Sequence, residues 1–446
     1  MGIYLPATAT AGNSVLGNRI GPRADGNTFV TANTQSIGIN IYNSPNNIIG
    51  GNSAGARNII SANENYGIEI LNAGATGNTI KGNYIGLNSS GTAIIGGSSQ
   101  EYGVFFTGSA TGNTIGGLTG AERNVISGNS SSGILLASNT NTVVGNYIGP
   151  QADGITHLAS TPQWYGIHIN GSSSNVIGGN TANARNVISD NTQHGVQVNG
   201  AVATGNSIKG NYIGVDKNGT TFILSSLQQY GVYVWNSAAG NGIGGSGSGE
   251  GNVISGNISS GIYLNSSAAG GNYVLGNTIG PQANGTSYLA SNAQAYGIQI
   301  AASPNNIIGG NTPGHRNVIS ANEDYGIYIS GGASTGNTIK GNYIGIDKNG
   351  TGFITSSTQQ NGVGLSAPSN IIGGSAAGEG NVISGNSDPV AAYGIRFVAF
   401  SSDNCSVLGN IIGPQADGNT NLTNNAQHYG IWLDRTANTV IGGSSV

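Results

Sequence analysis

Three phrases recur along this chain, and their spacing restricts the fold more than any other feature of the sequence. The longest is "NTIKGNYIGIDKNGT", which begins at Asn337 and returns in closely related form at Asn206 and Asn78, about 130 residues apart. A second phrase, such as "RNVISAN" at Arg316, recurs every 62 to 66 residues, and a third, Gly-Ile/Val-x-apolar, occurs fourteen times at spacings of 29 to 36 residues. Self-similarity at such periods indicates stacked structural units that share one continuous core.

Each unit of the repeat contains three short runs in which apolar residues alternate with others. In one unit these runs are "GIYI" from Gly326, "NTIKGN" from Asn337 and "NYIGID" from Asn342. Runs of four to six residues with period two predict β-strands, and the Gly- and Asn-rich joints between them predict turns. No coil can bury its own inner face, so the coils must stack. We therefore predict an all-β fold, with residues 1–446 forming one parallel β-helix domain of about 14 coils, each of three short strands. The Asn residues that head the runs are expected to form ladders of side-chain amides.

Every second coil is predicted to carry a longer insertion, such as residues 153–166 and 219–231. Because the insertions recur at one place in the coil, they should form a ridge along one side. Each insertion has a Gln three residues before the Gly that opens the next strand, while the neighbouring residues vary. We interpret this side chain as structural, tying the insertion to the coil backbone. The residues are Gln35, Gln100, Gln163, Gln228, Gln294, Gln359 and Gln427.

The charge and composition of the chain exclude several kinds of partner. Charged residues make up only 7% of the chain and the net charge is -4. Nucleic-acid binding needs clustered Lys and Arg, so we expect no nucleic-acid partner. No run approaches the 18 or so apolar residues of a membrane-spanning helix, so we expect no membrane insertion. Cys405 is the only cysteine, and therefore no disulfide can form within the chain.

The pattern "GIxI…NxIxGN…NxIxxN" resembles the right-handed parallel β-helix repeats of the pectate-lyase-like and NosD-like proteins. The resemblance covers essentially the whole chain, and it is specific for architecture and poor for activity. It implies a right-handed coil and an extracellular or cell-surface location. The group includes polysaccharide lyases and hydrolases, phage tailspikes, adhesins and structural surface proteins, so function does not follow from the fold.

Catalytic carboxylates of parallel β-helix enzymes cluster on one outer face, so we searched the outward positions for acids. The x of Gly-Ile-x-Ile supplies one acid, and across neighbouring coils one acid cluster stands out, formed by Glu64, Glu69 and Glu101. A pair of carboxylates at the spacing that glycosidases use is not visible in this column. We interpret the three residues as solvated surface acids, with a catalytic role as the alternative.

One group of aromatic residues also falls on the expected outer face. Tyr233, Trp235 and Tyr263 lie at outward positions of adjacent coils, where strands are about 4.8 Å apart. Aromatic rings in such a row could stack on sugar rings, which would make this a glycan-binding site. We favour the simpler interpretation that they form an aromatic cluster covered by the neighbouring insertion.

The sequence predicts no metal site and no cofactor. The phrases "IGVDKNGT" from Ile213 and "IGPQADG" from Ile148 and Ile412 place an acid near a Gly turn, which leaves calcium as an alternative. A calcium site usually needs more than one carboxylate, however, and Asn284 replaces the acid in a matching copy. The histidines are too dispersed to suggest zinc: His157, His168, His194, His315 and His428.

These observations led us to expect a non-catalytic extracellular structural or adhesive β-solenoid, part of a surface protein or filament. The reasons are the near-uniform coils and the lack of any coil that chemistry has visibly disturbed. The alternatives are a polysaccharide-processing lyase or hydrolase, a tailspike-type β-helix, or a glycan-binding module. We interpret the chain as a fragment or uncapped subunit of a larger assembly, and we expect end-to-end self-association, with polysaccharide as the other candidate partner.

Overall fold

The structure is a computed structural model, and it describes most of the chain in two compact units. The described residues are 1–9, 11–30, 35–95, 100–159, 163–223, 228–265, 270–289, 294–354, 359–388, 390–398, 402–423 and 427–442. Unit 1 comprises residues 1–217 and 223–228, and unit 2 comprises residues 218–222 and 229–446. The predicted single domain over residues 1–446 stays a prediction.

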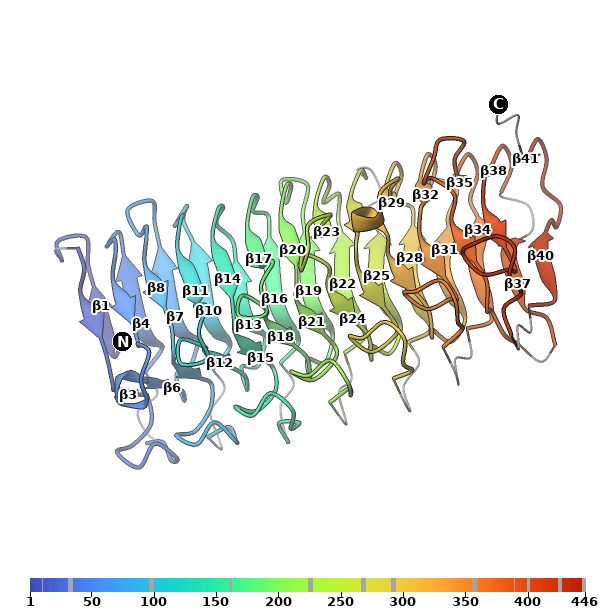
Figure 1. The fold of residues 1–446 in the computed structure, drawn as a ribbon. Coiled ribbons are helices and arrows are strands. Elements are labelled where there is room, and N and C mark those ends of the chain that lie inside the picture. Colours follow the sequence, from blue (N-terminus) through green and yellow to red (C-terminus); the bar gives the residue numbers. More distant parts are fainter. Residues whose placement is uncertain are drawn as a thin grey trace. The chain divides into compact units, whose positions relative to one another are not determined.

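Unit 1 consists of coils that each contribute one strand to three parallel sheets, which we call A, B and C (Figure 1). Sheet A contains β1 (Ile3–Leu5), β4 (Ile37–Tyr42), β7 (Tyr66–Leu71), β10 (Tyr102–Thr107), β13 (Ser132–Leu136), β16 (Tyr165–Asn170) and β19 (His194–Asn199). Sheet B contains β2 (Ser14–Val15), β5 (Ile48–Ile49), β8 (Thr79–Ile80), β11 (Thr114–Gly116), β14 (Thr142–Val144), β17 (Val176–Gly178) and β20 (Ser207–Lys209). Sheet C contains β3 (Arg19–Ile20), β6 (Ile59–Ile60), β9 (Tyr84–Ile85), β12 (Val125–Ile126), β15 (Tyr147–Ile148), β18 (Val187–Ile188) and β21 (Tyr212–Ile213).

Unit 2 repeats this arrangement with its own strands. Sheet A contains β22 (Tyr230–Trp235), β25 (Ser260–Asn265), β28 (Tyr296–Ala301), β31 (Tyr325–Ser330), β34 (Asn361–Ser366), β37 (Tyr393–Phe397) and β40 (Tyr429–Trp432). Sheet B contains β23 (Gly242–Gly244), β26 (Tyr273–Leu275), β29 (Ile307–Gly309), β32 (Thr338–Lys340), β35 (Ile371–Gly373), β38 (Ser406–Leu408) and β41 (Val440–Ile441). Sheet C contains β24 (Val253–Ile254), β27 (Thr278–Ile279), β30 (Val318–Ile319), β33 (Tyr343–Ile344), β36 (Val382–Ile383) and β39 (Ile411–Ile412).

The predicted fold class is confirmed: the chain forms a right-handed parallel β-solenoid built from three-stranded coils. Helix is almost absent, since the helices of the described residues are the single turns η1 (Ala54–Ala56) and η2 (Pro313–His315). No helix in the described ranges has both the length and the apolar character that crossing a membrane requires.

The alternating pattern of each first strand sorts its side chains between the core and the outer face. In β7, Ile68 and Ile70 are fully buried, while Glu69 between them is half-buried on the outside. In β31, Ile327 and Ile329 are likewise fully buried on either side of a half-buried Tyr328. Because strands pair in strict register, the inward residues of successive coils stack into one continuous apolar core.

The predicted Asn ladders are present at the heads of the second and third strands. Asn78 Nδ2 donates to Asn113 Oδ1 of the next coil at 2.9 Å, and Asn83 Nδ2 donates to Asn124 Oδ1 at 3.0 Å. The backbone N–H of Asn83 donates to the same Asn124 oxygen, so each amide satisfies buried groups on two coils. In unit 2 the sulfur of Cys405 takes the place of an Asn, and Asn370 N–H donates to it at 3.5 Å. Because an unpaired buried polar group is costly, these ladders fix the coil corners.

The insertions contact one another across the coil that separates them. Ser89 N–H donates to the carbonyl of Gly26, Ala152 N–H to that of Gly91, and Lys217 N–H to that of Gly154, all at 2.9 Å. Unit 2 contains the same contact between Lys348 N–H and Gly285 at 3.0 Å, among others. The described parts of the insertions therefore form a continuous row in each unit, which agrees with the predicted ridge.

Candidate functional site

The outer face of sheet A in unit 1 brings two of the three predicted acids to one aromatic cluster. Strand register places Asn40, Glu69 and Phe105 side by side on β4, β7 and β10, and it places Tyr66 beside Tyr102. The Tyr66 ring lies 4.9 Å from the Phe105 ring at an interplanar angle of 9°, and 5.7 Å from the Tyr102 ring at 29°. Asn40 Nδ2 donates a short hydrogen bond to Glu69 Oε2.

The pKa values of the ionisable groups in this cluster are shifted by burial and by the nearby carboxylates. Burial raises the pKa of Glu69, and the hydrogen bond from Asn40 only partly offsets this effect. Burial also raises the pKa of Tyr66, to which the carboxylates of Glu69 and Glu101 both add. Both carboxylates therefore act on the same tyrosine hydroxyl. Burial again raises the pKa of Tyr102, and the nearby Glu101 carboxylate adds to the shift.

The third predicted acid, Glu64, does not join this cluster. Its side chain is exposed, and its backbone N–H donates to the carbonyl of Gln35 on the neighbouring coil. Glu69 and Glu101, by contrast, are half-buried. Asn40 is nearly fully buried, and its Oδ1 accepts no hydrogen bond from the described residues. A ligand hydroxyl that reaches this oxygen would therefore satisfy it.

The three predicted aromatic residues of unit 2 also meet on the outer face. Tyr233 and Tyr263 are paired directly in register, with ring centroids 5.1 Å apart and an interplanar angle of 16°. The Trp235 ring lies 6.0 Å from that of Tyr233 at 13° and is 38% exposed. Burial raises the pKa of Tyr263 to about 12, and the neighbouring tyrosines contribute. The cluster is thus half-buried at the Tyr pair and open to solvent at Trp235.

The predicted structural Gln residues form a ladder with Asn residues of the neighbouring coils. The sequence predicted the structural role of the Gln residues but not their Asn partners. Gln100 Nε2 donates to Asn129 Oδ1 at 2.8 Å, and Asn63 Nδ2 donates to Gln100 Oε1 at 2.8 Å, so Gln and Asn alternate from coil to coil. The same alternation passes through Gln35, Gln163, Gln228, Gln294, Gln359 and Gln427. The Gly that opens each first strand makes room for this row, since a Cβ at Gly67 would lie 2.7 Å from Gln100 Nε2. These bonds join side chains to side chains, and Gln294 Nε2 also donates to the carbonyl of Ile254 at 3.4 Å. The tethering of the insertions stays a prediction.

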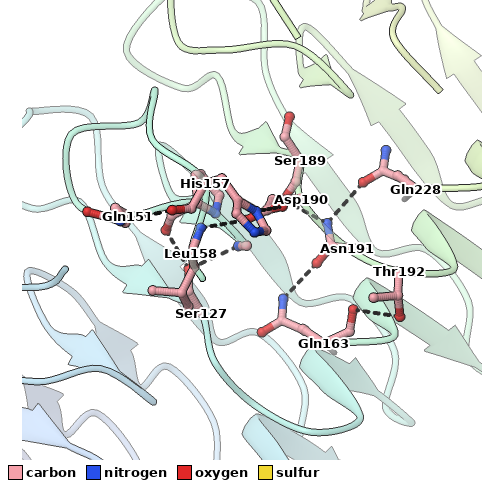
Figure 2. A network of polar contacts seen from close by, with 12 residues as sticks. Ser127, Gln151, His157, Leu158, Gln163, Ser189, Asp190, Asn191, Thr192 and Gln228 are labelled. Atoms are coloured by element: carbon pink, nitrogen blue, oxygen red, sulfur yellow. Dashed lines mark hydrogen bonds and ion pairs between the residues drawn. The ribbon is translucent and has the colours of Figure 1, made fainter. Parts of the chain in front are cut away.

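A histidine–aspartate pair that sequence reasoning missed lies beside this ladder, and Figure 2 shows it. His157 Nδ1 lies 2.5 Å from Asp190 Oδ1, and Leu158 N–H donates to Asp190 Oδ2 at 2.9 Å. The Asp190 side chain is 3% exposed and that of His157 is 31% exposed. Burial raises the pKa of Asp190, whereas the Leu158 N–H and His157 lower it.

The sequence does contain a signal for this pair. Asp190 stands in the phrase "RNVISDN", where the other five copies have Ala or Gly at that position. The backbone there is left-handed, with φ 64° at Asp190 and φ 80° at Gly128 of an equivalent coil. In the equivalent coil Ile94 packs against Gly128. His157 and Asp190 occupy the corresponding positions in their own coil pair. Aligning the insertions with the corners that they cover would have exposed both substitutions.

The carboxylates of Asp153 and Asp417, which lie in the Gly turns, accept hydrogen bonds from backbone N–H groups of their own turns. Asp153 Oδ1 accepts the N–H groups of Ile155 and Thr156 at 2.9 and 2.8 Å, and Asp417 Oδ1 accepts those of Asn419 and Thr420 in the same way. Within the described ranges no group of three or more His, Cys, Asp or Glu side chains could hold a metal ion. The expectation of no cofactor, with calcium as its alternative, stays a prediction.

Comparison with known proteins reveals similar folds but no family. No family model matches the chain, and no curated protein sequence matches it. The structure is similar to an alginate lyase from Paenibacillus sp. strain FPU-7, with 14% identity, a TM-score of 0.37, and coverage of 84% of this chain and 99% of that chain. It is similar to the Dettilon tailspike protein, with 14% identity, a TM-score of 0.42, and coverage of 89% and 62%. It is also similar to the mannuronan C-5 epimerase A-module of Azotobacter vinelandii, with 11% identity, a TM-score of 0.37, and coverage of 99% and 91%.

These results correct our expectation of a non-catalytic structural or adhesive solenoid. The similar solved structures include lyases, epimerases and a tailspike. One coil pair departs from the repeat, because His157 and Asp190 replace the residues found in the other copies. At these identities the likeness shows the parallel β-helix fold alone, so function has to be argued from the side chains.

Proposed function

We propose that this chain binds and cleaves a polysaccharide on the outer face of sheet A, with Glu69 and Glu101 acting on the glycosidic bond. The observation that carries the proposal is the setting of Glu69, which is half-buried against Tyr66 and Phe105 and hydrogen-bonded to Asn40. Aromatic rings offer apolar surface to a sugar ring, and side-chain amides and carboxylates offer partners to its hydroxyl groups.

The two acids suit the two tasks of glycoside hydrolysis. One carboxyl group must hold a proton and donate it to the glycosidic oxygen as the bond from that oxygen to the anomeric carbon breaks. Burial raises the pKa of Glu69, which suits it to this acid role. In a single displacement Glu101 takes the proton of the water whose oxygen bonds to the anomeric carbon. In the two-step alternative Glu101 itself bonds to the anomeric carbon, and Glu69 then takes the proton of the water that breaks this bond.

The local charge favours a neutral polymer over an acidic one. The strands around the site, β4, β7, β10 and β13, contain no Lys or Arg, so no cation on them faces Glu69. An acidic polysaccharide would meet like charge at the Glu101 carboxylate, and this repulsion would weaken binding. Elimination from a uronate would also lack a positive group to stabilise the developing negative charge. We therefore favour hydrolysis of a neutral polysaccharide, and with it a secreted or cell-surface location.

The test is incubation with neutral polysaccharides such as glucans, mannans and xylans, and with alginate and pectate as acidic controls. Release of reducing ends from a neutral polymer should fall about 100-fold or more in Glu69→Gln and in Glu101→Gln. The matched control is Glu64→Gln, because Glu64 is exposed and lies outside the cluster. Full activity in both site variants, or the absence of cleavage of every polymer, would overturn the proposal.

A second candidate function, glycan binding without cleavage, rests on the exposed ring of Trp235 beside Tyr233. Affinity gel electrophoresis in the same polymers should then show retardation that Trp235→Ala removes. Trp164→Ala is the control, since Trp164 is 51% exposed, lies just before β16 and packs edge-on against Tyr165. End-to-end self-association stays a prediction.

A further inference from the structure

A cavity of about 550 Å³ opens on sheet C of unit 2, at a place where the repeat loses two of its side chains. In four coils an Arg ahead of the third strand lies over a Tyr ring of the next coil, at 3.9 to 4.1 Å from the ring centroid. The pairs are Arg57 with Tyr84, Arg123 with Tyr147, Arg185 with Tyr212, and Arg316 with Tyr343. In each pair the planar guanidinium lies over the tyrosine ring in a cation–π contact, and the pair covers the outer side of sheet C.

The coils that follow Arg316 do not continue this filling. Gly380 stands where the next Arg would be, and Ile411 stands where its Tyr partner would be. Strand pairing places Val382 between Tyr343 and Ile411, so these three residues form the floor of the cavity. The space therefore corresponds to an aromatic ring and a guanidinium that the repeat supplies in the four Arg–Tyr pairs, although the coils of Gly251 and Thr278 lack them as well.

The walls of the cavity combine one fixed cation with polar backbone. Arg316 Nε donates to the carbonyl of Gly341 at 3.3 Å, which holds the guanidinium against Tyr343 and leaves its terminal nitrogens for the cavity. The opposite wall is the loop of residues 374–378, which is rich in Gly and Ala and presents backbone groups. The nearby Lys340 and Glu379 neutralise each other through an ion pair of 3.0 Å.

We propose that this cavity binds one pyranose residue. A pyranose has an apolar face that fits the floor of Val382 and Ile411, and a rim of hydroxyl groups that fits the guanidinium of Arg316 and the backbone of residues 374–378. Cavities of this size hold small ligands of this kind. The proposal rests on the proposed function for its choice of ligand class, but the cavity lies on sheet C, and the cluster around Glu69 belongs to sheet A of the other unit.

Saturation-transfer NMR with the methyl glycosides of glucose, galactose, mannose and glucuronic acid tests this proposal. The native protein should give saturation transfer to at least one of these glycosides. Ile411→Tyr introduces the ring that other coils carry at this position, and it should weaken binding at least tenfold. Ile371→Tyr is the control, because Ile371 is 38% exposed on β35 and does not line the cavity.

A second variant protects the test against misfolding of the first. Ala377 is exposed on the loop of residues 374–378, so Ala377→Trp should block the cavity without touching the core. Equal binding by the native protein and a folded blocking variant, or no saturation transfer to any glycoside, would refute the pyranose site. Glu69→Gln should keep this binding while it loses cleavage, so failure of the site and failure of the proposed function give different results.

Discussion

His157 Nδ1 and Asp190 Oδ1 lie 2.5 Å apart, and the two residues come from an insertion and from the corner of the next coil. The other copies of this corner have Ala or Gly, and the insertion residue that covers it is apolar or aromatic, such as Ile94 or Phe353. The two substitutions stabilise the fold only when both are present. A buried Asp190 carboxylate without a partner would lower the stability of the folded state, and a His157 imidazole opposite Gly would have no side chain to bond to.

This coupling predicts the outcome of a double-mutant cycle. His157→Phe leaves Asp190 buried with Leu158 N–H as its remaining donor, so it should cost about 2–4 kcal/mol of unfolding free energy. Asp190→Gly should cost less, because Gly relieves the left-handed backbone and His157 is partly exposed. The double variant restores the repeat and should be close to the native protein. Urea denaturation measures all four free energies, and additive costs would show that the residues are not coupled.

Acid should destabilise unit 1 through two histidines of sheet A. Burial lowers the pKa of His168 and of His194 to about 4, from an ordinary value of 6.5. The folded state thus binds protons less readily than the unfolded state. The associated stability is fully present above pH 6.5 and is lost as the pH falls toward 4, by up to about 1.4 kcal/mol per pH unit for each histidine.

The control for this prediction uses residues that the repeat itself supplies. His168 on β16 is paired in register with Gln197 on β19, and His194 on β19 is paired in register with Tyr165 on β16. The variant His168→Gln with His194→Tyr should therefore fold, and its unfolding free energy should decline less between pH 7 and pH 4.5. Parallel pH profiles of the two proteins would contradict the assignment.

The contrast between inward and outward positions gives a third prediction. Ile327 is fully buried, so Ile327→Ala should cost about 2–5 kcal/mol. Tyr328 is half-buried and lies 5.0 Å from the Tyr325 ring, so Tyr328→Ser should cost less, about 0.5–1.5 kcal/mol of ring contact. Equal shifts of the denaturation midpoint would contradict the in/out assignment.

The sequence predicted the coils because their information is local and periodic. The alternation of apolar residues with period two identifies Ile327 as an inward residue. The Asn at the head of each run predicts a ladder, because stacking of equal coils is enough to place these side chains next to one another. The acid cluster could be found in part, since Glu69 and Glu101 lie on adjacent coils, but the exposed Glu64 does not join them. Alignment of the repeat copies can reveal the substitutions at His157 and Asp190. The contact between the two side chains depends on how an irregular insertion meets the next coil, and strand register does not encode that path.

The last prediction concerns Gln294, which joins three coils through its side chain. Its Nε2 donates to Asn322 Oδ1 at 2.9 Å, and its Oε1 accepts from Asn257 Nδ2 at 3.1 Å. Gln294→Ala removes a partner from two buried amides, so it should cost about 1–3 kcal/mol. We expect faster hydrogen exchange in residues 284–289, 294 and 295, and unchanged protection in β25 and β28.

The control for this variant is Gln282→Ala. Gln282 Nε2 donates to the carbonyl of Tyr288 within the same insertion, at 3.0 Å, and makes no contact with the ladder. It should loosen the turn around Tyr288 while the exchange of residues 294–296 stays native. Loss of protection in the core strands alone would show that the ladder supports the coil and leaves the insertion untethered.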